Sequence, residues 1–170
     1  LRLLELVKGP KTSDEVYDTV TEFGETTLGK GIVHAKDTPG FIGNRLINAS
    51  GPLTFHKAME FGLTVEDVDA LSGTLIGNAK SAYFRTQDVV GLDTALNVMN
   101  NMYDRVTTES EEERQKFKAP DLLVKLVENG RLGQKSGQGW YKKEGKEILS
   151  LDSDTMEYTP TKKRMFDTIR

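Results

Sequence analysis

The sequence predicts a mainly α-helical fold with a small strand–helix–strand edge at its N-terminus. Two short apolar runs, residues 1–7 and 31–35, bracket a segment in which apolar residues recur at helical spacing. From residue 38 onward the same spacing returns through most of the chain, which is typical of helices that bury one face. A length of 170 residues is sufficient for one or two domains with a buried core.

Residues 1–35 have the size and order of a βαβ unit. The run 1–7 suits a buried strand and ends at Gly9-Pro10. The stretch TSDE at residues 12–15 favours a helix start, because it combines a capping hydroxyl with early acids. Gly29 and Gly31 end that helix, and the second strand follows. Such a unit is expected to have parallel strands and a right-handed connection.

The stretch KDTPGFIGNRL, residues 36–46, joins a turn to a long helix expected over residues 41–61. Asp37 or Thr38 can cap its first turn, and Pro39 fits the first helical position. Asn44 then lies one turn inside the helix. Asparagine has a modest cost there, so the position invites a functional reason.

The elements that follow are helical up to a glycine-rich loop. Thr64 and Asp67 open a short helix that ends near residue 71. The further expected elements are an irregular stretch at 73–86, helices at 92–103 and 120–130, a charged loop or surface helix at 107–118, a glycine loop at 133–139 and a hairpin around Glu144-Gly145. We expect three parts: 1–35, a helical domain at 36–150 and a polar tail at 151–170.

Composition narrows the possible classes of protein. The formal net charge is −3, which argues against a general nucleic-acid binder, because phosphate binding needs a basic face. The absence of cysteine excludes disulfides and thiolate chemistry and fits a reducing, cytoplasmic location. With only two histidines, no metal site is expected. No apolar run reaches the ~18 residues of a membrane span.

The chain starts with Leu1 rather than methionine, inside an apolar run. This start predicts a piece cut from a longer protein. A processed mature terminus is the alternative.

Five stretches carry a resemblance to one enzyme family. They are LLELV at 3–7, KDTPGFIGNRL at 36–46, EFG at 60–62 followed by VEDVD at 65–69, VVGLD at 89–93, and KSGQGWY at 135–141. In order and spacing they resemble the C-terminal domain of the 3-hydroxyacyl-CoA dehydrogenase family, as far as about Lys142. The resemblance implies a helical C-terminal dehydrogenase domain, preceded by a residual βαβ edge of the Rossmann-type domain.

The same resemblance implies the chemistry of the parent enzyme. Such enzymes oxidise 3-hydroxyacyl-CoA to 3-oxoacyl-CoA with NAD in fatty-acid β-oxidation. The family's G-x-G-x-x-G loop and catalytic histidine correspond to positions before Leu1, the histidine about twelve residues before Glu5. The fragment alone is therefore expected to be inactive, with NAD bound mainly by the absent N-terminal domain.

The departures from the family pattern point to a subtype. SAYFRT at 81–86 stands where the family usually has M-G-P-F-x-L. With the stretches 77–80 and 147–152, it resembles the multidomain bacterial proteins in which the dehydrogenase is fused to an enoyl-CoA hydratase.

The resemblance assigns roles to three residues. Glu5 is expected to orient the histidine and Asn44 to approach the substrate's thioester region, both as catalytic residues. Lys135 is expected to reach the bound nucleotide. The alternatives are a solvated carboxylate at a strand edge, a packing hydrogen bond and a solvated lysine.

Other readings of the chain stay open. It could be a helical substrate-wall or association module without chemistry, or belong to a 3-hydroxybutyryl-CoA or hydroxy-acid branch. The expected partners are an acyl-CoA substrate and further copies of the chain. Asp67 and Asp69 are read as a solvated helix face rather than a metal pair, and His34 and His56 as structural or exposed.

Overall fold

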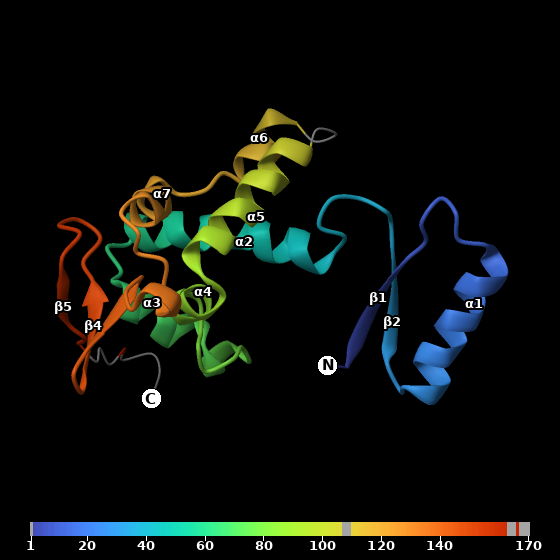
Figure 1. Ribbon diagram of the computed structural model, residues 1–170, viewed down its shortest axis with the longest axis horizontal. Coiled ribbons are helices and arrows are strands. Elements are labelled where there is room, and N and C mark those ends of the chain that lie inside the picture. Colours follow the sequence, from blue (N-terminus) through green and yellow to red (C-terminus); the bar gives the residue numbers. More distant parts are fainter. Residues whose placement is uncertain (1, 107–109, 163–165, 167–170) are drawn as a thin grey trace. The chain divides into compact units, whose positions relative to one another are not determined.

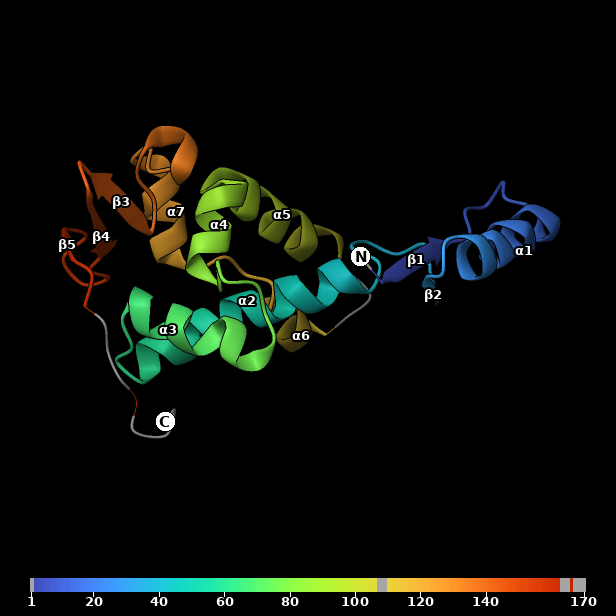
Figure 2. The same ribbon diagram turned by 90° about the horizontal axis from the view of Figure 1, so that it is seen from below.

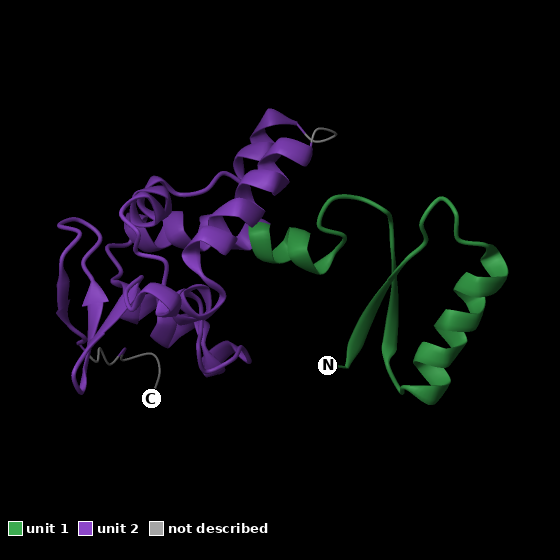
Figure 3. Ribbon diagram, in the orientation of Figure 1, with its two compact units in different colours: residues 1–48 green, residues 49–170 purple. Residues whose placement is uncertain are grey.

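A computed structural model describes residues 2–106, 110–162 and 166 of the chain. The chain divides into two compact units, residues 1–48 and 49–170, which Figure 3 shows in different colours. Helices dominate the described residues, so the prediction of a mainly α-helical fold is confirmed. The expected parts 1–35, 36–150 and 151–170 stay a prediction.

The first unit is a βαβ unit, as predicted. Strand β1 (Leu3–Val7) pairs in parallel with β2 (Gly31–Ala35), with Glu5 opposite Val33, and helix α1 (Asp14–Glu22) connects them (Figure 1). Ser13 caps α1 by accepting the N–H of Val16. Tyr17 attaches the helix to the sheet, because its hydroxyl bonds the Leu6 carbonyl at 3.3 Å and His34 Nδ1 at 2.7 Å.

The long helix begins later than the sequence predicts. Helix α2 spans Gly43–Glu60, so a start at Pro39 with Asp37 or Thr38 as the cap is wrong. Residues 39–42 form a turn, in which Gly40 and Phe41 have positive φ values of 75° and 47°. A helix cannot pass through this left-handed backbone, and it begins only after the turn.

The second unit contains five helices among the described residues, in addition to most of α2. They are α3 (Val65–Ser72), α4 (Phe84–Val90), α5 (Leu92–Arg105), α6 (Glu111–Gln115) and α7 (Asp121–Glu128). Thr64 and Asp67 form the predicted capping box of α3. The stretch 73–86, predicted to be irregular, contains a 3₁₀ turn at Thr74–Ile76 and the start of α4.

The second unit also contains a three-stranded antiparallel sheet near the C-terminal end of the chain. Its strands β3 (Tyr141–Glu144), β4 (Glu147–Leu151) and β5 (Tyr158–Pro160) lie in that order, as Figure 2 shows. The predicted hairpin is confirmed, since Glu144 pairs with Glu147 across the turn at Gly145. The segment expected to be only a polar tail supplies β5, which pairs with β4.

The core of the second unit is built around Trp140, which is 1% exposed. Its ring centroid lies 4.5 Å from that of Phe84 and 6.0 Å from that of Phe55. The indole N–H donates to Gln87 Oε1 at 2.9 Å, so the buried ring keeps a polar partner. Leu92, Leu123 and Leu126 belong to the same buried cluster. Among the described residues, no helix is both long and apolar enough to cross a membrane.

Candidate functional site

Glu5 lies on β1 and its carboxylate binds the N-terminus of α2. Oε2 accepts the N–H of Ile42 at 3.1 Å, and Oε1 accepts the N–H of Gly43 at 2.8 Å. The first amides of a helix have no partner within the helix, and the positive end of the helix dipole favours a negative group there. Glu5 therefore caps a helix that begins 38 residues later in the chain.

Gly43 permits this close approach. A Cβ atom at position 43 would lie 2.7 Å from Oε1 of Glu5, closer than ordinary contact allows. The carboxylate therefore sits against the bare Cα of the first residue of α2.

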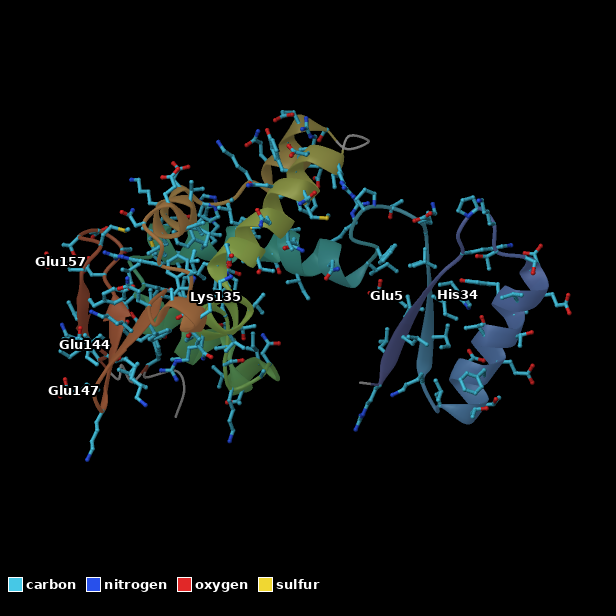
Figure 4. All side chains as sticks on the ribbon, viewed as in Figure 1. Glu5, His34, Lys135, Glu144, Glu147 and Glu157 are labelled. Carbon is cyan, nitrogen blue, oxygen red and sulfur yellow. The ribbon has the colours of Figure 1, made fainter. Side chains whose placement is uncertain are left out.

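Asn44 follows Gly43 directly, in the first turn of α2, and is exposed. Its main-chain carbonyl oxygen accepts a hydrogen bond from the side-chain amide of Asn48 at 2.7 Å. The structure thus places Glu5 and Asn44, the two residues predicted to be catalytic, at the same end of one helix. Figure 4 labels Glu5 on its strand.

Lys135 belongs to the second unit and lies in a 3₁₀ turn, Gln134–Ser136. Its Nζ atom is 2.5 Å from Oδ1 and 2.6 Å from Oδ2 of Asp93, in the first turn of α5. The ammonium holds the pKa of the Asp93 carboxyl below its ordinary value by this hydrogen bond. This exposed ion pair joins the VVGLD and KSGQGWY stretches, and Figure 4 shows Lys135 labelled.

Asp88 is a buried carboxylate that the sequence analysis does not predict. It is 5% exposed, and its two carboxylate oxygens accept the N–H groups of Trp140 and Tyr141, each at 2.9 Å. Burial raises the pKa of Asp88 to about 6. The signal for Asp88 in the sequence is two glycines before Trp140, at positions 133 and 139. A Cβ on Gly139 would fall 2.1 Å from Oδ1 of Asp88, and one on Gly133 would fall 2.4 Å from its carbonyl oxygen.

Asp69 is a second carboxylate that joins separate elements of the second unit. It accepts the N–H groups of Phe84 and Arg85 at the start of α4, at 2.6 and 3.2 Å, and the hydroxyl of Tyr141 at 2.9 Å. Burial raises the pKa of Asp69. The prediction that Asp67 and Asp69 lie on a solvated helix face is therefore wrong. Asp67 is buried and forms the capping box of α3 with Thr64, and Asp69 joins α3 to α4 and β3.

Each of the two histidines contacts an aromatic side chain. His34 bonds Tyr17 rather than Glu5, and Figure 4 labels it on its strand. His56 is exposed on α2, and its ring contacts Phe55 with the centroids 6.0 Å apart. Within the described ranges, no group of three or more histidine, aspartate or glutamate side chains could hold a metal ion.

Comparison with known proteins gives the family of this chain. Residues 40–143 match the model of the 3-hydroxyacyl-CoA dehydrogenase C-terminal domain. A probable 3-hydroxyacyl-CoA dehydrogenase of Bacillus subtilis is 44% identical over 158 residues, which are 93% of this chain and 20% of the relative.

Two solved structures show the same fold. One is FadB2 of M. tuberculosis, with a TM-score of 0.67 and 33% identity. The other is the (S)-3-hydroxybutyryl-CoA dehydrogenase of Ralstonia eutropha, with a TM-score of 0.68 and 28% identity. Each match covers 85% of this chain and 48% of the solved chain. The chain therefore spans between a fifth and a half of the length of these relatives.

Proposed function

Because this chain belongs to the 3-hydroxyacyl-CoA dehydrogenase family, we propose that it forms part of an enzyme that oxidises a 3-hydroxyacyl-CoA to a 3-oxoacyl-CoA with NAD. We call the protein that holds this chain together with a nucleotide-binding segment and a histidine the complete enzyme. In that enzyme the histidine takes the hydroxyl proton while hydride leaves for the nicotinamide. The cofactor supplies the redox chemistry and the protein positions it.

The observation that supports the proposal is the position of Glu5 at the end of α2 that carries Asn44. The carboxylate contacts the amide of Gly43, the residue directly before Asn44. A carboxylate can orient an imidazole and an amide side chain can bind a polar substrate atom, so both groups at one helix end suit the proposed reaction. We assign Glu5 the orienting role and Asn44 the thioester-binding role.

We assign only a supporting part of the NAD site to this chain. The sequence contains no G-x-G-x-x-G loop to hold a pyrophosphate. Lys135 is the residue proposed to reach the nucleotide from this side, and its ammonium is held at the surface by Asp93. We therefore assign NAD binding mainly to the nucleotide-binding segment of the complete enzyme.

The setting of the reaction is proposed from the length of one relative. Because the chain covers only a fifth of the Bacillus subtilis relative, that protein has room for further domains. This length supports a multifunctional enzyme. On the resemblance of residues 77–86 and 147–152, we propose that it is a cytoplasmic enzyme of fatty-acid β-oxidation that is fused to an enoyl-CoA hydratase. The parts 1–35, 36–150 and 151–170 are proposed as a nucleotide-domain remnant, the helical domain and a tail.

The experiment compares Glu5→Gln with Glu15→Gln in the complete enzyme. Glu15 is an exposed glutamate in the first turn of α1 and serves as the control. NADH formation from a 3-hydroxyacyl-CoA should fall on the order of 10²- to 10⁴-fold in the Glu5 variant only. Activity within about twofold of the wild type would leave Glu5 a merely structural residue. The chain alone should produce no NADH above a blank.

Two alternatives have support of their own. The Ralstonia eutropha structure is named a 3-hydroxybutyryl-CoA dehydrogenase, which supports a short-chain substrate. Values of kcat/KM for C4 and long-chain substrates would separate the two classes. Exposed apolar side chains on the second unit, such as Leu53 and Phe61, support self-association of the chain as an association module.

A further inference from the structure

We propose that the main-chain amides of Ile42 and Gly43 are positioning groups for Glu5. They fix the plane of its carboxylate so that it can hold an imidazole in one orientation. This inference rests on the proposed function, because it gives a structural cause for the orienting role of Glu5.

Two hydrogen bonds hold the Glu5 carboxylate, one to each oxygen. Each carboxylate oxygen has its own donor, Ile42 for Oε2 at 3.1 Å and Gly43 for Oε1 at 2.8 Å. Two bonds from adjacent amides fix both the position and the rotation of the carboxylate. An ionised carboxylate has about four lone-pair directions, so acceptor capacity remains for an imidazole N–H. We call these two amides, of Ile42 and Gly43, the clamp. The clamp orients the Glu5 carboxylate and leaves acceptor positions on it for a histidine.

The backbone directly before α2 forms the turn that directs these two amides. The donors point at Glu5 because the chain turns sharply at residues 39–42, with Phe41 at a φ of 47°. A residue other than glycine is strained in this region, and such strain is concentrated at functional sites. Glu5 in turn sits on β1, which the parallel pairing with β2 holds in register. A strained turn and a paired strand thus hold the donors and the acceptor.

The clamp also sets the position of Asn44. Because Gly43 and Asn44 are consecutive residues of one helical turn, an amide that holds the carboxylate fixes the helix start that carries Asn44. The two groups proposed to act on the histidine and the substrate are therefore held in one register.

The test in the complete enzyme is Gly43→Pro, which loosens the Glu5 carboxylate in two ways. It removes the N–H donor of residue 43, and it places a Cβ atom 2.7 Å from Oε1 of Glu5. Proline is tolerated at the first residue of a helix, so α2 can still form. The control is Asp14→Pro, which places proline at the first residue of α1 in the same unit. We expect kcat to fall about tenfold in Gly43→Pro, as for the loss of one hydrogen bond, while KM for NAD stays unchanged.

The pH profile separates positioning from general damage. A loosened carboxylate stabilises the imidazolium less, so the acidic limb of kcat should move to lower pH in Gly43→Pro and stay in place in Asp14→Pro. Reduced activity with an unmoved limb would overturn the inference. If the complete enzyme forms no NADH from a 3-hydroxyacyl-CoA, the proposed function itself fails. If Glu5→Gln leaves activity intact, Glu5 has no orienting role and the inference fails with it. If Glu5→Gln abolishes activity while Gly43→Pro matches the control, only the positioning role fails.

A second measurement needs only the chain of 170 residues. By NMR, the amide protons of Ile42 and Gly43 should exchange slowly, and this protection should weaken in Glu5→Gln. Amides of Ile42 and Gly43 that exchange as in an unfolded peptide would contradict the clamp even if Gly43→Pro fails to fold.

Discussion

Gly139 and Asp88 are packed so closely that a Cβ at position 139 would lie 2.1 Å from Oδ1 of the carboxylate. This contact explains why the chain carries glycine directly before Trp140. The same oxygen accepts the N–H of Trp140, so the carboxylate, the glycine and the tryptophan form one buried contact.

Gly139→Ala should therefore destabilise the protein strongly. The new methyl group has to displace a carboxylate that is held by two backbone amides, at a cost of about 3 kcal/mol or more. Gly137→Ala is the matched control, because no atom lies within 4 Å of its Cβ position and only its left-handed φ of 78° opposes the change. We expect about 1 kcal/mol for the control. Urea unfolding measures both, and equal losses would contradict the packing argument.

Much of the fold could be predicted from the sequence because the signals are local. The capping box at Thr64 and Asp67 and the turn at Gly145 each depend on residues close in the chain. The start of α2 does not follow from local sequence, because its cap comes from Glu5, 38 residues before Gly43. The partners of Asp88 lie 52 and 53 residues away, so no pattern close to Asp88 reveals this carboxylate, and its signal in the sequence lies at the distant glycines 133 and 139.

The free energy of unfolding should depend on the titration of Asp88. Burial raises its pKa to about 6, above the ordinary aspartate value of about 4. Between these values the folded state binds more protons than the unfolded state, so this residue's contribution to stability falls as the pH rises through the window. The loss is on the order of 3 kcal/mol.

Asp88→Asn tests this assignment, because the amide does not titrate. Denaturant unfolding at several pH values should show the difference between wild type and variant change between about pH 4 and pH 6 and level off above that range. Parallel curves for the two proteins across the window would show that Asp88 does not titrate there.

Asn44→Ala should reduce catalysis by the complete enzyme without unfolding it. Asn44 is exposed, so little packing is lost, and alanine favours a helix. The loss of one hydrogen bond to an oxygen that gains charge costs roughly 2.7–4 kcal/mol of barrier in comparable sites. Asn101→Ala, at an exposed position of α5, is the control. A lowered melting temperature with unchanged kcat would favour a packing role for Asn44.

Lys135→Met should weaken NAD binding by the complete enzyme. A hydrogen bond from a charged group contributes about 1.5–3 kcal/mol, so KM for NAD should rise roughly tenfold or more, with kcat little changed. Stability should change by less than about 1 kcal/mol, because the pair with Asp93 is exposed. Lys143→Met, on β3, is the control. An unchanged KM for NAD would leave Lys135 with only its ion pair to Asp93.

The chain is expected to self-associate, and two surfaces could mediate the contact. In the second unit, a groove of about 410 Å³ is lined by Leu53, Phe61, Leu63 and Ile76, and Phe61 is 69% exposed. In the first unit, β1 and β2 form a two-stranded sheet with unpaired edges, and Phe23 is 51% exposed. Phe61→Asp and Phe23→Asp place the same charge on one surface each. We expect light scattering to show a dimer that Phe61→Asp dissociates and Phe23→Asp preserves. The reverse result would assign the contact to the first unit, and a wild-type monomer at every concentration would contradict self-association altogether.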